Sequence, residues 1–209
     1  CMFLNDLATT HPEEAARRVP RESHSSGFYW PGPPYVVPSA TWRASAPPGL
    51  VEKTPHLANT VADWEEDWPV LGVSWEDGIA YASWAWRRHA EPITLPHELE
   101  WEKAARGTDR RWFPFGRHWD SDWCNNNSSV KEGARPVAVD SFPHDESPYG
   151  VRGLAGNSRD ACLNDPEPPN VGWRLFRGGG WAYVAIYSRT AYRGGNPPRH
   201  PHFTFGFRL

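Results

Sequence analysis

The chain has little sulfur, little net charge and no long apolar run. Its 209 residues include one methionine and three cysteines (Cys1, Cys124 and Cys162), whose odd number and wide spacing do not support a disulfide framework. A net charge of −3 gives no reason to expect nucleic-acid binding. No apolar run approaches the ~20 residues of a membrane span, and no signal-peptide pattern opens the chain. We therefore expect neither membrane insertion nor export, and the cytoplasm is slightly favoured.

Common catalytic motifs are also missing from the sequence. There is no GxSxG, HExxH or P-loop pattern. The acidic groups Glu65-Glu66-Asp67 and Glu100/Glu102 are typical of a solvated turn and a charged helix face. The residues by themselves therefore do not indicate nucleophilic or acid–base catalysis.

Tryptophan, glycine and proline are abundant instead. The chain has 13 Trp, 18 Gly and 22 Pro, which argues against a helical bundle and for a loop-rich α+β fold with indoles as packing units. The length fits one domain over residues 1–209. We expect an irregular N-terminal part with a lead-in helix (1–68) and a motif-bearing part (69–209). Because Cys1 falls inside the predicted lead-in helix, the start resembles a cut from a longer chain.

Two helices are predicted in the motif-bearing part. Ser74 and Asp77 form a capping-box pattern, and the helix that follows places Ile79, Ala82 and Trp86 on one face. A second helix is predicted from His97 to Arg106, ended by Gly107. Core positions are expected for Trp75, Trp86, Trp101 and Trp181.

The rest of the chain is expected to form loops and short strands. Residues 70–73 and 136–142 have strand-like patterns, whereas 120–129 is typical of turns. Residues 20–59 are predicted to be loops with short strands. The glycines at 178–180 are predicted to let the backbone pass close to packed aromatic rings.

Six sequence blocks occur in the order known from one protein family. They are PVLGVSWEDGIAY (69–81), TLPHELEWEKAARG (94–107), FPFG (113–116), LAGNSRDA (154–161), RGGGW (177–181), and RTAYR (189–193) followed by GFR (206–208). Together they resemble the formylglycine-generating enzyme (sulfatase-modifying factor) family over two thirds of the chain. The resemblance implies an α+β, C-type-lectin-like fold with two helices around small antiparallel sheets.

The resemblance implies copper-dependent oxidation, but this sequence lacks the cysteines that would bind the copper. Active members bind copper through two cysteines just after the GGS block, but residues 181–188 (WAYVAIYS) contain no thiol, and hydroxyl groups cannot replace soft thiolates. We therefore expect no copper and interpret Cys162 as a small buried hydrophobe. A second branch uses non-haem iron held by a partner domain; His200 and His202 are the nearest ligand pair, and we interpret them as a surface loop.

The resemblance also implies a calcium site. Carried over residue by residue, its ligands are Asn125, Gly156, Ser158 and Asp160. Gly153 stands where the family has Asp or Asn, and Asp160 replaces a longer Glu. Because calcium takes six to eight oxygen ligands, the site is expected to be weak. A hydrogen-bonded turn is the alternative.

The C-terminal segment, residues 178–209, suggests a different function. From Ala182 to Phe205 its framework residues match the family, and all residue types between them can be encoded by codons with any base at the first two places and a pyrimidine at the third. This pattern resembles the variable region of proteins diversified by diversity-generating retroelements. The predicted ligand-binding positions are Ala182, Tyr183, Val184, Ala185, Ile186, Tyr187, Tyr192, His200, His202, Phe203, Thr204 and Phe205.

Three functions remain open from the sequence. The preferred one is a non-catalytic module that binds a protein or other macromolecular ligand through a variable aromatic surface, because tyrosine-rich surfaces with small spacers resemble paratopes. This hypothesis expects the aromatic residues to be contiguous and largely accessible. The alternatives are a metal-dependent oxidase with an altered active site and a sensory domain appended to a serine/threonine kinase.

Overall fold

The helices begin and end where local capping groups are available. The computed structural model describes residues 1–21, 33–37, 64–131, 133–165 and 172–209, so most of the segment predicted as loops (20–59) lies outside the described residues. The helices are α1 (Met2–Thr10), α2 (Pro12–Arg17), α4 (Trp75–His89) and α5 (Glu98–Arg106), with 3-10 turns η2 (Ser121–Trp123) and η3 (Ala185–Ser188).

Both predicted helices of the motif-bearing part are confirmed. The Ser74 hydroxyl accepts the Asp77 N–H, and the Asp77 carboxylate accepts the Ser74 N–H at 2.9 Å, which completes the capping box of α4. His97 caps α5, and Gly107 ends it at a φ of 65°. No helix in the described ranges is long and apolar enough to cross a membrane.

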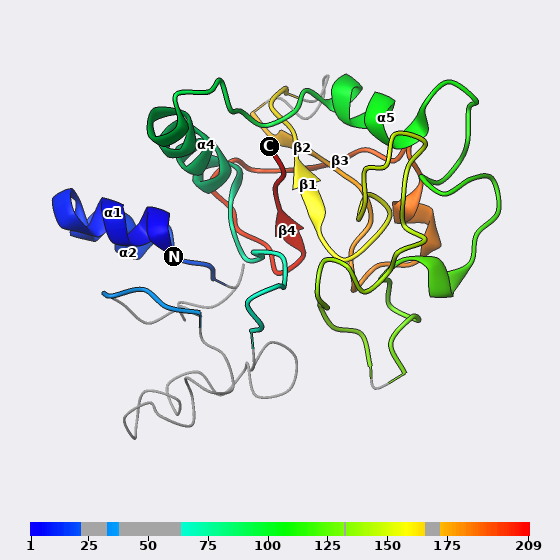
Figure 1. Cartoon of the computed structure of the whole chain (residues 1–209), viewed down its shortest axis with the longest axis horizontal. Helices are drawn as coiled ribbons and strands as arrows, with labels where there is room; N and C mark the ends of the chain where they lie inside the picture. The colour runs from blue at the N-terminus through cyan, green and yellow to red at the C-terminus, as the bar shows by residue number, and fades with distance from the viewer. Residues whose placement is uncertain (22–32, 38–63, 132, 166–171) are drawn as a thin grey trace.

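The sheet is small and mixed. Its strands are β1 (Arg159–Ala161), β2 (Arg174–Arg177), β3 (Gly194–Asn196) and β4 (Phe205–Gly206), in the order β3-β2-β1-β4. The α+β class is confirmed, and β3, β2 and β1 are antiparallel as predicted. However, β4 pairs parallel with β1, which corrects the prediction of purely antiparallel sheets. The strands lie between α4 and α5 (Figure 1).

Two predicted strands are wrong for identifiable reasons. At 136–142 the Asn157 side chain takes the place of a neighbouring strand: its Oδ1 accepts the Val137 N–H at 3.1 Å, and its Nδ2 donates to the Val137 carbonyl. At 70–73 Gly72 has a φ of 71°, which interrupts the extended run, and Val73 keeps a single bridge to His202. The turn predicted at 120–129 is confirmed, since the Asp120 and Asn126 side chains accept nearby backbone N–H groups.

Two of the four expected core tryptophans are fully buried. Trp101 lies in a cluster with Ala105, Leu154, Cys162 and Leu175, and Trp181 lies in one formed with α1 and α2. Trp75 is only half-buried.

The core position predicted for Trp86 is wrong, because its side chain is 54% exposed. The buried stripe of α4 consists of the small residues Gly78, Ala82 and Ala85, beside which Asp77 is also buried. A Cβ at Gly78 would lie 3.4 Å from the Phe207 ring, so the helix packs closely there. Trp86 comes after this stripe, in the last turn of the helix.

Candidate functional site

The glycines at 178–180 bring the C-terminal segment against the turn at 154–157. A Cβ at Gly179 would lie 2.1 Å from the Ala155 carbonyl oxygen, and one at Gly178 would lie 2.9 Å from the Leu154 carbonyl oxygen and 3.2 Å from the Trp101 ring. The predicted close approach is therefore confirmed at Trp101, and the closest contacts are to backbone. Only glycine permits this approach, which fixes where the following residues emerge.

Three tyrosines from this segment lie side by side. The ring centroids of Tyr183 and Tyr187 are 4.7 Å apart, and those of Tyr187 and Tyr192 are 4.8 Å apart. All three side chains are half-buried, and η3 adds two exposed apolar neighbours, Val184 (49% exposed) and Ile186 (46%). We call these five residues the aromatic face.

Arg159 of β1 contacts the rings of this face from the protein interior. Its side chain is 5% exposed, and its guanidinium carbon lies 5.5 Å from the Tyr183 ring centroid and 5.3 Å from that of Tyr192. Its Nε and Nη2 donate to the carbonyls of Gly178 and Phe176 at 3.0 and 3.1 Å. Desolvation by burial lowers the pKa of Arg159, while the neighbouring tyrosines raise it. A cation therefore lies beneath the aromatic face.

The predicted binding positions contact one another, but their solvent exposure differs from residue to residue. The rings of His202, Phe203 and Phe205 continue the series of contacts, with centroids 4.3 and 4.6 Å from His202 to the other two. However, Phe205 is 4% exposed and stacks on Phe176, and Thr204 is fully buried, so their predicted accessibility is wrong. β4 carries Phe205 into the sheet, where its side chain faces the core.

The remaining predicted binding positions also differ in solvent exposure. His200 is exposed, as expected for a surface loop, while Ala182 and Ala185 are half-buried. His202 and Phe203 are half-buried too, and Phe203 packs beside Trp181. The expectation that the aromatic residues are largely accessible is therefore wrong for Phe205, and the other aromatic residues are half-buried. The exposed positions of the set are Val184, Ile186 and His200.

The cysteines do not fit a copper centre. Cys124 and Cys162 are fully buried, and burial raises the pKa of both thiols. The interpretation of Cys162 as a small buried hydrophobe is confirmed. Tyr183 and Ser188 belong to the segment after Gly180, and neither side chain supplies the soft thiolate that Cu(I) selects. We therefore derive no copper-dependent step.

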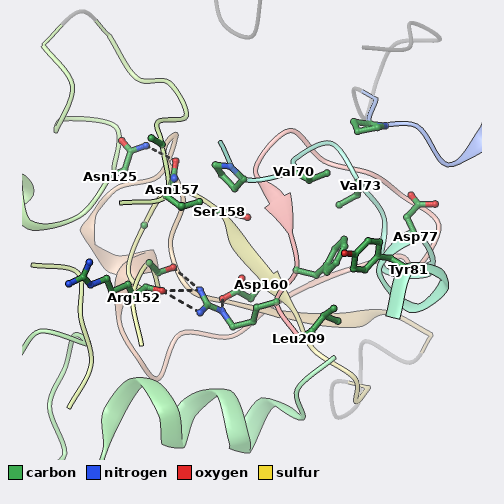
Figure 2. Close-up of a pocket in the computed structure, with 18 of the residues that line it drawn as sticks. Val70, Val73, Asp77, Tyr81, Asn125, Arg152, Asn157, Ser158, Asp160 and Leu209 are labelled. Carbon is green, nitrogen blue, oxygen red and sulfur yellow. Dashed lines mark hydrogen bonds and ion pairs between the residues drawn. The ribbon is translucent and has the colours of Figure 1, made fainter. Parts of the chain in front are cut away.

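The four residues predicted to bind calcium line one cavity of about 730 Å³. Figure 2 shows Asn125 and Asn157 on one side of this cavity and Asp77 and Tyr81 on the opposite side, with Ser158 and Asp160 beside β1 between them. The structure thus brings Asn125, Gly156, Ser158 and Asp160 to the same cavity.

Their contacts do not fit a calcium site. Oδ2 of Asp160 accepts hydrogen bonds from Arg208 Nε at 2.6 Å and Trp101 Nε1 at 2.8 Å, so a cation already neutralises the only carboxylate of the set. The Asn125 amide donates to the Asn157 side chain, and its Oδ1 accepts from Ser129. In the described part of the chain, no three His, Cys, Asp or Glu side chains are grouped to hold a metal. Calcium binding itself stays a prediction.

Sequence reasoning missed three residues near these sites. Arg159 replaces an aromatic residue in the block at 154–161, and nothing local marks it as buried under tyrosines. Trp112 is an exposed ring whose centroid lies 5.2 Å from the Arg189 guanidinium. Asp145 is buried beside the cavity, and both of its carboxylate oxygens accept the Ala155 N–H at 3.0 Å. Of these three residues, only Arg159 had a signal in the sequence, which was its unusual position within a known family block.

Known proteins resemble most of the chain. Residues 34–209 match the Sulfatase-modifying factor enzyme 1-like domain (FGE-sulfatase). The chain is 32% identical over 213 residues to the formylglycine-generating enzyme of Thermomonospora curvata, covering 85% of this chain and 67% of that protein. It is 32% identical over 170 residues to the Bos taurus enzyme, covering 68% of this chain and only 43% of that protein.

The chain is also similar to a protein kinase and to one solved structure of a variable protein. A serine/threonine-protein kinase of Chlamydia caviae is 33% identical over 157 residues, which cover 67% of this chain and 23% of the kinase. The solved structure of Treponema denticola variable protein 1 superposes with a TM-score of 0.57 at 20% identity, covering 72% of this chain and 73% of that one. This similarity shows a shared fold alone.

The sequence blocks, the α+β architecture and the matched residues agree. The fold is the C-type-lectin-like fold of formylglycine-generating enzymes, and the chain belongs to the sulfatase-modifying factor enzyme 1-like (FGE-sulfatase) family.

Proposed function

We propose that this chain is a non-catalytic module that binds a macromolecular ligand through the aromatic face. The observation that carries this proposal is the contact series from Tyr183 through Tyr187 to Tyr192, with exposed Val184 and Ile186 beside it. Tyrosine gives large, rigid contact area with few rotatable bonds, as in antibody paratopes. Clustered exposed apolar side chains are also more typical of binding surfaces than of ordinary protein surface.

The scaffold beneath the face supports this use. Trp181 and Phe176 are buried, and the Gly178–Gly180 backbone is in close contact with the turn at 154–157. The exposed side chains of Val184 and Ile186 can therefore change without altering the core. We propose that the exposed positions are diversified, in line with the codon pattern, and the fold shared with Treponema denticola variable protein 1 is consistent with this.

Diversification is tested by sequencing the codons for residues 178–209 in many descendants of one clone. Substitutions are expected to concentrate at Val184, Ile186 and the three tyrosines. The framework residues Arg193 and Gly206 should not change. A near-repeat of this coding segment close to the gene, with adenines at the variable codon positions, would support diversification by a retroelement. Substitutions spread evenly over the segment, or none at all, would overturn the proposed variability.

A second candidate is a sensory or scaffold domain attached to a kinase. The similarity to the Chlamydia caviae kinase favours it, since that match covers 67% of this chain. An oxidase with altered chemistry is the weaker alternative, because the chain has no thiol between Trp181 and Ser188. Elemental analysis of the purified protein tests the oxidase: stoichiometric copper or iron would favour it over the binding module.

A further inference from the structure

Arg159 differs from the other arginines around the sheet in having no acidic partner. Its contacts are two backbone carbonyls and the rings of Tyr183, Tyr192 and Phe205; no carboxylate in the described ranges lies within ion-pair distance of it. The neighbouring ion pairs are Arg174–Asp165, Arg177–Glu102, Arg193–Glu98, Arg199–Glu76 and Arg208–Asp160. Buried charges in proteins are normally paired, because burial without a partner is costly.

A second guanidinium beside the aromatic face has the same property. Arg189 follows η3, is exposed, and stacks on the exposed Trp112 ring at 5.2 Å without an ion pair to any described residue. Residues 172–209 contain six arginines and no aspartate or glutamate. Five of these six arginines form ion pairs with carboxylates from other parts of the chain. Arg189 and Arg159 are therefore the two cations beside the aromatic face that have no ion pair among the described residues.

The tyrosine hydroxyl groups can connect this buried charge to a ligand. Tyr183, Tyr187 and Tyr192 are half-buried, and the rings of Tyr183 and Tyr192 lie over Arg159. The Tyr183 hydroxyl accepts a hydrogen bond from buried Thr204 at 3.3 Å and keeps its own proton for a further acceptor. A phenolic hydroxyl beside a guanidinium is a good donor to an anion. An acidic group at the surface would accept from these hydroxyls and would be attracted by the cation beneath them.

We propose that the aromatic face binds an acidic peptide segment of a partner protein, with a carboxylate over the tyrosines above Arg159 and apolar side chains on Val184, Ile186 and Trp112. This inference rests on the proposed binding function and names the chemistry of its ligand. A carboxylate matches the single charge of Arg159, whereas a phosphate dianion would exceed it. The exposed apolar residues around the tyrosines suit a polypeptide.

The test uses short synthetic peptides on an array, in three sets with identical flanking sequences and Glu, Gln or Lys at the central positions. The full chain should bind the Glu set best. Arg159→Met should weaken binding to that set by about tenfold, ~1.4 kcal/mol, and Arg159→Lys should retain most of it. Arg189→Met, at an exposed position, should weaken it in the same direction.

Arg199→Met is the matched control. It removes the same charge from an exposed arginine that pairs with Glu76 on α4, and it should leave the peptide preference unchanged. Equal binding of the three sets would overturn the acidic-ligand inference and leave the proposed function standing. If the triple variant Val184→Ser/Ile186→Ser/Tyr187→Ser binds the peptides as the wild type does, the proposed function is contradicted instead. Binding to none of the sets would overturn the inference.

Discussion

Single residues couple the tryptophan core to buried charges. Trp101 is buried, its Nε1 donates to Asp160, and its ring centroid lies 5.3 Å from the Arg177 guanidinium. Replacing Trp101 by Ala should lower the free energy of unfolding by about 3–5 kcal/mol, because a large cavity forms and Asp160 loses a donor. Chemical denaturation monitored by circular dichroism measures this change.

Trp86→Ala provides the matched control for this prediction. The same substitution in α4 removes a side chain that is 54% exposed, so the free energy of unfolding should change by about 0.5 kcal/mol or less. Similar losses for the two variants would contradict the burial that the structure assigns to these indoles.

Asp145 makes stability depend on pH. Burial raises the pKa of this carboxyl to about 7, against the opposing effect of the Ala155 N–H and the Arg208 charge. The folded state therefore holds a proton that the unfolded state releases near pH 4. The stabilisation is complete below about pH 4 and is lost as the pH rises through about 7.

The variant Asp145→Asn isolates this effect. Between pH 5 and pH 7, the free energy of unfolding of the wild type should fall relative to that of the variant, by at most ~1.4 kcal/mol per pH unit. Urea denaturation across this range gives the difference. A difference that stays constant between pH 5 and pH 7 would mean that the backbone N–H groups keep the folded carboxylate ionised.

Sequence reasoning succeeded where the residue types themselves carry the information. The missing thiols after Gly180 are visible in the sequence itself, and the burial of Cys162 follows from the general tendency of free cysteine to be buried. The positions of Arg159 and Asp145 were not, since each is defined by groups that tertiary folding brings together.

Among the elements, α4 depends on its first turn. Ser74→Ala removes the hydroxyl that accepts the Asp77 N–H at 3.2 Å and donates to its carboxylate at 2.7 Å. The expected loss is about 1 kcal/mol in the free energy of unfolding, whereas Ser74→Gly should lose only a few tenths. Thermal denaturation of both variants gives the comparison. A loss below about 0.3 kcal/mol for Ser74→Ala would show that the capping hydroxyl contributes little to α4.

The same contrast explains which elements were predictable. The caps of α4 and α5 lie within four residues, so the sequence displays them. The strands have two to four residues, and their pairing joins β1 to β2 and to β4 across distant parts of the chain. Strand-like patterns at 70–73 and 136–142 misled because Gly72 and the Asn157 side chain decide the backbone geometry there.

For the whole molecule, the family blocks predicted the fold, whereas the loops between the blocks determine the surface. Residues of the blocks form β1 and the last residue of β2, and η3 with the residues on both sides of it forms the aromatic face. Which of the twelve predicted positions are accessible required the structure, because buried Thr204 and Phe205 directly follow half-buried His202 and Phe203 in a segment too short to show periodicity.

The most direct test of the binding function is a selection of random displayed peptides with the wild-type chain and with Val184→Ser/Ile186→Ser/Tyr187→Ser. These are surface or half-buried positions, so both proteins should have melting temperatures within a few degrees of each other. The account predicts that the wild type enriches a defined set of peptides and that the triple variant loses them. Enrichment of the same peptides by both proteins would contradict it.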